Sequence, residues 1–377
     1  MTPAPLGIYV HWPYCARICP YCDFNVVRDR GRVAEQRALR GAILADLTAH
    51  AALTGPRPLV SIFLGGGTPS LMDPAWAAEI IETARGLWAP TSDLEVTLEA
   101  NPTDAETARF AAFAEAGVNR LSLGVQSLDE AELEFLGRNH DAASARHAAR
   151  RALAAFPRVS LDLIYALPRQ GVAAWTDRLR AAIDLGAEHI SPYQLTIEAG
   201  TAFDRSVRRG TLIAPGPDLA ADLYETTQGV LEAAGFEAYE VSNHARGETA
   251  RSRHNLIYWR GHDYVGVGPG AHGRLTLAAG RFATEAPREI AGYVAAAGEA
   301  GTRLERLSAP DIATERLLMG LRTVEGVALD ELAALAIPPE RLSRLGDLVS
   351  VQGSRLRVTR RGRPVLDRIV AQLAGNA

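Results

Sequence analysis

Apolar runs of the kind that form buried strands alternate with longer segments of helical periodicity over the first 200 residues. Several runs are nearly continuous in apolar residues, as expected for parallel strands that are covered on both faces. The pattern therefore predicts a parallel α/β sheet with right-handed crossovers. The predicted strands span residues 7–11, 60–64, 94–100, 120–123, 159–165 and 189–195.

The segments between these runs carry recognisable helix ends. Leu39, Ile43 and Leu47 recur at a spacing of four residues and predict a helix before the second strand. Asp73 followed by Pro74 is typical of a capped helix start. Further ends are predicted from capping boxes at Thr103 with Glu106 and at Ser127 with Glu130, and from C-terminal glycines at Gly117 and Gly137.

Six strand–helix units are too few for a closed eight-fold barrel, so we expect an open, partial (β/α)6 barrel over residues 1–200. Its ligands would lie at the C-terminal ends of the strands, where the loops gather. Residues 201–305 are predicted to form an α/β extension that completes the core domain. Residues 306–377 pattern as helices followed by a hairpin around Gly353 and Ser354 and a last helix over 364–373, which predicts a winged-helix-like module.

Composition narrows the class of protein. The chain has 377 residues, 47% of them hydrophobic and 22% charged, with a formal net charge of −4, as in an ordinary soluble protein. All 40 basic residues are arginine, which excludes a Walker-type phosphate loop and a Schiff-base lysine. No signal peptide and no apolar run of ~18 residues is visible, so we expect a cytoplasmic protein that is not an integral membrane protein.

The three cysteines of the chain all lie in the segment Cys15-Ala-Arg-Ile-Cys19-Pro-Tyr-Cys22, just beyond the first predicted strand. Three thiolates on one short loop suit three corners of an iron–sulfur cube and leave its fourth iron open. Two other interpretations stay open at this point. One is a zinc site with His11 or Asp23 as fourth ligand, and the other is a redox pair of Cys19 and Cys22.

Polar and glycine residues recur at the ends of the other predicted strands. Residues 65–69 (GGGTP) follow the second strand, and glycines there would allow close backbone approach to a ligand. Glu99, Gln126 and Asp162 lie at or inside later strands, where polar groups need partners that a ligand could supply. Arg138 could pair with a ligand carboxylate. The sequence thus predicts one site on one rim of the sheet.

The chain resembles the radical S-adenosylmethionine (SAM) superfamily and, more narrowly, the oxygen-independent coproporphyrinogen III oxidase family. The resemblance is carried by CxxxCxYC, GGGTP, EANP, RLSLGVQS, LGRNH and SLDLIYALPRQ, in this order. It continues through YQLTIEAGT, YEVSNHAR, SRHNLIYW and YVGVGPGAHG and covers nearly the whole chain. It implies a radical SAM partial barrel for the first 200 residues.

The resemblance also implies roles for single residues. Cys15, Cys19 and Cys22 would hold a [4Fe–4S] cluster whose open iron SAM chelates. The residues that would line the SAM site are Tyr9, Tyr21, Gly66, Gly67, Thr68, Glu99, Gln126, Arg138 and Asp162.

Two branches of that family differ near the cluster loop. Decarboxylating oxidases carry a further CxC element and a long segment ahead of the loop, whereas here Asp23-Phe24 follows Cys22 and fourteen residues precede Cys15. These features resemble the HemW-type haem chaperones, which bind haem and pass it to acceptor haemoproteins. We therefore expect a haem chaperone, with acceptors of the respiratory chain among the candidates. The alternative is a SAM-dependent coproporphyrinogen III oxidase.

The motif His254-Asn-Leu-Ile-Tyr258-Trp259 is the predicted haem element. Imidazole is a common axial ligand of haem iron, and Tyr258 and Trp259 could offer flat apolar surface to the porphyrin. Arg251 and Arg253 could face the propionates. Other histidines compete with His254 for the role of iron ligand: His11, His140, His244, His262 and His272.

A basic cluster in the C-terminal module suggests an alternative function from another class of protein, namely nucleic-acid binding. Basic runs are usually solvated faces, and the family resemblance gives no support for DNA binding. We therefore expect no nucleic-acid partner. The cluster comprises Arg355, Arg357, Arg360, Arg361 and Arg363.

Overall fold

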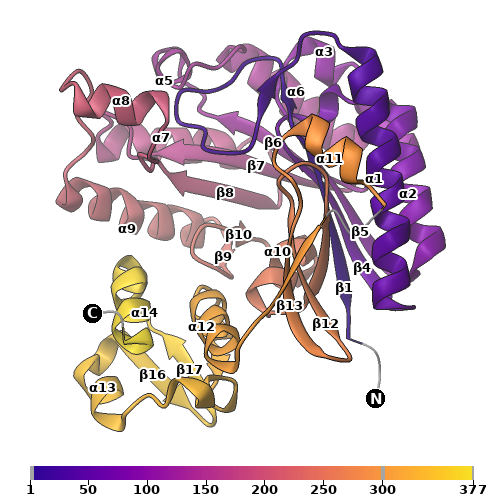
Figure 1. Cartoon of the computed structure of the whole chain (residues 1–377). Coiled ribbons are helices and arrows are strands. Elements are labelled where there is room, and N and C mark those ends of the chain that lie inside the picture. The colour runs from indigo at the N-terminus through magenta and orange to yellow at the C-terminus, as the bar shows by residue number, and fades with distance from the viewer. Residues whose placement is uncertain (1–3, 299–301, 376–377) are drawn as a thin grey trace.

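One large sheet organises the computed structural model of the chain, and helices pack along it (Figure 1). The structure describes residues 4–298 and 302–375. The sheet strands are β1 Leu6–Trp12, β4 Pro58–Gly66, β5 Ala89–Ala100, β6 Arg120–Gln126, β7 Arg158–Tyr165, β8 His189–Gln194, β9 Glu237–Ala238, β10 His244–Ala245, β11 Asp263–Val267, β12 His272–Leu277, β13 Gly280–Glu285 and β14 Arg303–Arg306. They pair in the order β14-β13-β12-β11-β1-β4-β5-β6-β7-β8-β10-β9.

The parallel part of the sheet contains all six predicted strands, β1 and β4 to β8, in chain order. β11 lies beside β1 in parallel and extends it, although the short segment DYVGV was not predicted as a strand. Antiparallel strands border both edges, and no pairing between described residues closes the sheet into a barrel. The architecture is therefore an open, mixed α/β sheet, and its parallel part has one strand more than predicted.

Helices fill the connections between the strands. In Figure 1, α1 and α2 lie together along one side of the sheet, and α9 lies beneath β8. The helices are α1 Val33–Thr54, α2 Pro74–Leu87, α3 Asp104–Thr107, α4 Phe110–Glu115, α5 Glu130–Phe135, α6 Ala142–Ala155, α7 Val172–Ile183, α8 Ala202–Arg208, α9 Pro217–Ala233, α10 Arg253–Trp259, α11 Ile290–Ala296, α12 Ala309–Gly320, α13 Pro339–Arg344 and α14 Leu366–Ala374.

The two faces of the parallel strands differ in chemistry. Ile62, Leu98 and Leu121 belong to the apolar core, which also contains Leu39, Ile43 and Leu47 of α1. Alternate positions on the same strands, such as Glu99 and Ser122, line a cavity instead. Because successive strand residues point to opposite faces, this alternation separates a packed outer face from a polar inner face. Residues in the near-continuous apolar runs of the sequence therefore alternate between the two faces of the sheet.

Most of the predicted helix ends are confirmed. The Asp73 side chain accepts a hydrogen bond from Ala75 N, and Thr103 accepts from Glu106 N. Gly117 (φ 100°) and Gly137 (φ 67°) adopt the left-handed conformation that favours glycine.

The predicted capping box at Ser127 is wrong. Asp129 is the N-cap of α5 and accepts a hydrogen bond from Glu132 N at 3.1 Å. The Ser127 hydroxyl donates instead to the Glu132 carboxylate. The helix begins two residues later than predicted because aspartate, an equally good cap, stands nearer to its first turn.

The C-terminal part contains the predicted elements. Two strands, β16 Val349–Gln352 and β17 Arg355–Val358, form the hairpin, and β15 Val327–Ala328 pairs with β17. A second apolar cluster, which includes Leu317, Leu356 and Leu373, is separate from that of the large sheet. The boundaries at residues 200 and 305 stay predictions.

The basic cluster of this part is engaged within the protein. Arg360 forms an ion pair with Glu232 of α9 at 3.1 Å, and Arg361 forms one with Asp347. Arg355 donates to the carbonyl of Glu325 at 2.9 Å. Within residues 4–298 and 302–375, no helix combines the length and the apolar character that a membrane span requires.

Candidate functional site

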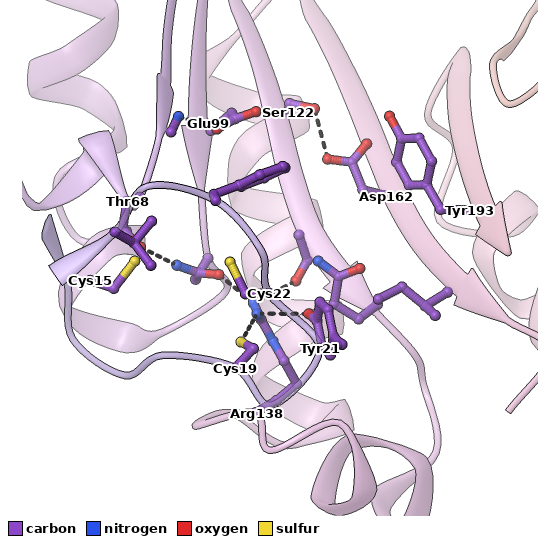
Figure 2. A pocket seen from close by; sticks show the side chains of 18 of the residues that line it. Cys15, Cys19, Tyr21, Cys22, Thr68, Glu99, Ser122, Arg138, Asp162 and Tyr193 are labelled. Atoms are coloured by element: carbon purple, nitrogen blue, oxygen red, sulfur yellow. Dashed lines mark hydrogen bonds between the residues drawn. The ribbon is translucent and has the colours of Figure 1, made fainter. Parts of the chain in front are cut away.

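A cavity of about 560 Å³ opens between the polar inner face of the sheet and the loop that carries the cysteines. Figure 2 shows side chains from both sides pointing into it. The predicted site residues that line it are Cys15, Cys19, Tyr21, Cys22, Gly66, Gly67, Thr68, Glu99, Gln126, Arg138 and Asp162. Eleven of the fourteen predicted positions therefore meet at one place.

Backbone pairing fixes both ends of the cysteine loop. Two short strands, β2 Tyr14–Cys15 and β3 Val27–Arg28, pair in parallel on either side of it. Asp29 N donates to the carbonyl of Cys15 at 2.8 Å, and Cys22 N donates to that of Cys19 at 3.2 Å. The loop is therefore a tethered turn that holds three thiols on one wall of the cavity.

The glycine loop after β4 packs directly against the cysteine loop. Gly67 N donates to the carbonyl of Trp12, and Thr68 N donates to that of Tyr14, both at 2.8 Å. A Cβ atom on Gly67 would lie 2.7 Å from the backbone of Pro13, and Gly66 adopts a φ of 106°. The glycines were predicted to admit a ligand. In the structure they also admit the neighbouring backbone, which couples the two loops.

A chain of hydrogen bonds runs from the glycine loop to the thiols. Asn101 Nδ2 donates to Thr68 Oγ1 at 3.1 Å, and the Arg138 guanidinium donates to Asn101 Oδ1. The same guanidinium donates to Cys19 Sγ at 3.1 Å and to Tyr21 OH at 3.4 Å. Arg138 thus places a positive charge beside the Cys19 sulfur and links the glycine loop to the cysteine loop.

Two carboxyl groups face the cavity from β5 and β7, the strands on either side of β6. Glu99 Oε2 accepts from Gly66 N at 3.0 Å, and Asp162 Oδ2 accepts from Ser122 Oγ at 2.8 Å. Burial, reinforced by the charge of Asp162, raises the pKa of Glu99 to about 8. Burial likewise raises the pKa of Asp162. A cationic ligand or ligand hydroxyls would therefore stabilise these two carboxyl groups in their ionised form.

Backbone strain is concentrated at two of the strand ends. Gln126, the last residue of β6, has a φ of 63°, and the register of β6 against β7 shifts just before it. Ala166 and Arg169, directly after β7, have φ values of 61° and 65°. Left-handed conformations of this kind cluster at ligand sites, since the surrounding structure must maintain them.

The thiols carry a cost of burial that bound metal would offset. Burial raises the pKa of Cys15 to about 11 and also raises that of Cys22, and deprotonation by a bound metal would offset that cost. In the described part of the chain, no three His, Cys, Asp or Glu side chains converge on a single point, as one zinc ion would need. His11 is occupied, with Nε2 bonded to the Asn25 carbonyl at 2.8 Å.

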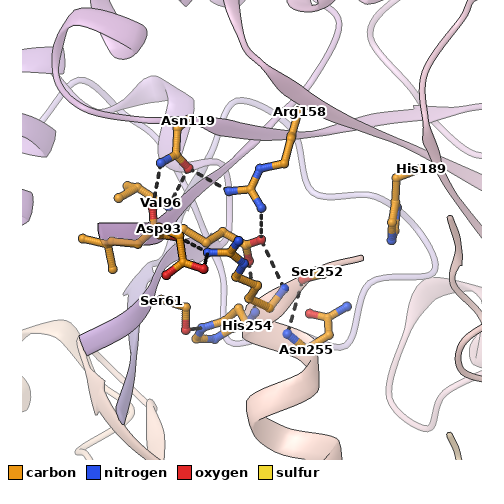
Figure 3. A network of polar contacts seen from close by, with 12 residues as sticks. Ser61, Asp93, Val96, Asn119, Arg158, His189, Ser252, His254 and Asn255 are labelled. Carbon is orange, nitrogen blue, oxygen red and sulfur yellow. Dashed lines mark hydrogen bonds and ion pairs between the residues drawn. The ribbon is translucent and has the colours of Figure 1, made fainter. Parts of the chain in front are cut away.

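The three remaining predicted residues do not reach the cavity. Tyr9 lies behind it, with its hydroxyl 3.0 Å from His11 Nδ1. His254 is 1% exposed, and both of its ring nitrogens are occupied, Nδ1 by Ser61 Oγ at 2.9 Å and Nε2 by Tyr258 OH at 2.7 Å. Figure 3 shows His254 within this buried polar network. The His254 ring is thus part of the core in this conformation, and its predicted role toward haem stays a prediction.

Trp259 likewise packs within the protein. The Arg322 guanidinium lies 4.8 Å from its ring centroid, and its carbonyl accepts from Arg316 at 3.0 Å. No histidine among the residues that the structure describes lines the large cavity. An axial histidine for haem is therefore not presented there by this conformation.

Several polar cavity residues escaped prediction, among them six that come from β6, β8, the segment before β10, and α10. For those on the strands, the only signal in the sequence was the alternation of residues between the two faces of the sheet. Asn255 belongs to the HNLIYW motif, so that motif contributes its asparagine to the cavity and not its histidine. The six residues are Arg120, Ser122, Ser191, Tyr193, Asn243 and Asn255.

Comparison with known proteins finds relatives over most of the chain. The Radical SAM superfamily model matches residues 9–180. The chain is 44% identical to the mouse "Radical S-adenosyl methionine domain-containing protein 1, mitochondrial" over 330 residues, 85% of this chain and 74% of that protein. It is 37% identical over 378 residues to "Heme chaperone HemW" of Mycobacterium tuberculosis H37Rv, 100% of this chain and 96% of that protein.

A solved structure matches the fold. Coproporphyrinogen III oxidase (HemN) from Escherichia coli superposes with a TM-score of 0.80 at 20% identity, covering 100% of this chain and 91% of that one. At this identity the likeness concerns the architecture alone. The family model and the relatives described above show that the chain belongs to the radical SAM superfamily, in the family of HemW-type heme chaperones.

Proposed function

We propose that this protein is a haem chaperone that binds a [4Fe–4S] cluster, SAM and haem and transfers haem to acceptor haemoproteins. One observation carries the proposal. The cavity is lined by three thiols and two carboxyl groups, as we expect of a radical SAM site, while Asp23 and Phe24 stand where the decarboxylating enzymes would carry a further cysteine element.

The residues at the cavity wall fit the two cofactors. Cys15, Cys19 and Cys22 would hold the cluster, since soft thiolates suit iron–sulfur clusters and the tethered loop presents all three together. Glu99 and Asp162 would accept hydrogen bonds from SAM or face its positive charge. The bound cluster would supply one-electron chemistry to SAM.

Exposed apolar side chains beside the thiols support a haem surface near the cavity. Phe24 is 62% exposed and Ile18 is 45% exposed, although both belong to the cysteine loop that lines the cavity. Large apolar side chains are normally buried, and a flat aromatic ring is well suited to a porphyrin face. Haem delivered from this surface would pass to an acceptor that docks over the same loop.

The proposal is tested by a transfer assay. The protein is reconstituted anaerobically with iron and sulfide, loaded with haem and mixed with an apohaemoprotein, and the absorbance of the acceptor is followed. We expect transfer from wild type, and slower transfer from Phe24→Ser, which removes the exposed ring. Thr48→Ser, an exposed substitution on α1, is the matched control. Absence of haem binding by wild type would refute the proposal.

A further inference from the structure

Arg120 is a buried cation that belongs to neither the proposed cluster site nor the proposed SAM site. It is the first residue of β6, is 3% exposed and lines the inner part of the cavity. The residues that the structure describes offer its guanidinium no ion pair within 4.0 Å and no side-chain hydrogen bond. Because an unpaired buried charge is costly, a ligand that pairs with it would bind strongly.

Carboxylates on the two strands beside β6 are engaged by other groups. Glu95 pairs with Arg158 at 2.9 Å and accepts from the backbone N of His254 at 3.0 Å. Asp162 accepts from Ser122 at 2.8 Å. Burial, and after it the charge of Arg120, lowers the pKa of His254.

Two amide side chains line the same cavity as this cation. Asn255 is carried by α10, and its side-chain amide is not bonded to another described residue. Ser191 donates to Asn243 Oδ1 at 2.7 Å, which fixes the second amide at the cavity wall. A guanidinium fork and amide donors in one cavity are suited to a carboxylate ligand.

Two carboxyl groups share the cavity with this cation. Burial raises the pKa of Glu99 to about 8. Burial also raises the pKa of Asp162, and the charge of Arg120 opposes that rise. The Arg120 guanidinium is buried and has no ion pair among the described residues, so it is the group in this part of the cavity that suits an anionic ligand.

We propose that Arg120, with Asn255 of the same cavity wall, binds a carboxylate of the second ligand of this cavity, namely a propionate of haem. The inference rests on the proposed haem-binding function and deepens it. It gives the HNLIYW motif a role through its asparagine, with His254 as the buried residue that positions α10. The carboxylate of SAM is the competing source of the same chemistry, and the experiment separates the two.

The experiment measures the dissociation constants of haem, haem dimethyl ester and SAM on the reconstituted protein. For wild type, we expect the ester, whose propionates are masked, to bind about tenfold or more weakly than haem. We expect Arg120→Gln to weaken haem binding to a similar extent, with no further loss for the ester. SAM affinity should stay within about twofold. Arg260→Gln, which alters an ion pair outside the cavity, is the matched control.

The outcomes are distinct. Equal binding of haem and its ester by wild type overturns the inference and leaves the chaperone function standing, and it does not depend on whether the variant folds. Weaker SAM binding by Arg120→Gln, with unchanged haem binding, assigns the cation to SAM and also overturns the inference. Wild type that binds neither haem nor the ester refutes the proposed function itself.

Discussion

Glu99→Gln should stabilise the apoprotein at high pH, because the wild-type side chain pays a cost to ionise in the cavity. A carboxyl whose pKa is raised on folding contributes stability that is fully present below its unfolded value of 4.5 and is lost as the pH rises through about 8. Raising the pKa from 4.5 to about 8 corresponds to an upper limit of roughly 5 kcal/mol. Because the cavity is open to water, we expect about 2 kcal/mol.

The assay is urea unfolding of apoprotein at pH 5, 7 and 9. The free energy of unfolding of Glu99→Gln should match that of wild type at pH 5 and exceed it progressively toward pH 9. Glu79→Gln, at an exposed carboxylate on α2, is the control and should differ from wild type by less than about 0.5 kcal/mol at every pH. A difference for Glu99→Gln that is independent of pH would refute the reasoning, because it would locate the effect in packing and not in ionisation.

Four further substitutions test other parts of the account. Cys15→Ser should abolish the visible absorbance of the reconstituted cluster, and a retained cubane would contradict the ligand assignment. Asp162→Ala should weaken SAM binding by about tenfold with the cluster intact, as measured by calorimetry, and unchanged affinity would exclude its role. Gly67→Ala should lower the free energy of unfolding by about 1–3 kcal/mol, since its Cβ would lie 2.7 Å from Pro13, and an unaltered value would mean that the loops are not coupled. His254→Ala should destabilise the protein by about 2 kcal/mol and leave the haem Soret maximum unchanged, whereas a shifted maximum would restore it as an iron ligand.

Local signals in the sequence were sufficient for the parallel strands and for the cysteine loop. Apolar runs, caps and glycines act within a few residues, so Asp73 and Gly137 could be assigned from their neighbours alone. The predicted cap at Ser127 was wrong because two good capping residues stand close together, and only the exact path of the chain decides between them. Strand β11 was not predicted because a five-residue strand that contains a glycine carries little hydrophobic pattern of its own.

The inner half of the cavity could not be predicted because it depends on which face of each strand turns inward. Arg120 and Ser122 stand in a run that reads as apolar, and their common face becomes visible only through pairing with the neighbouring strands. The same holds for the HNLIYW motif. Helix α10 turns Asn255 to the cavity and His254 to Ser61, and the sequence of the motif does not distinguish these two directions.

The most direct test of the central claim compares two activities on one reconstituted sample. The protein, with cluster, SAM and reductant supplied, is titrated with haem and, in parallel, incubated with coproporphyrinogen III. The account predicts saturable haem binding and no decarboxylated product above a cluster-free control. Product formation without haem binding would contradict it and would identify the protein as an oxidase.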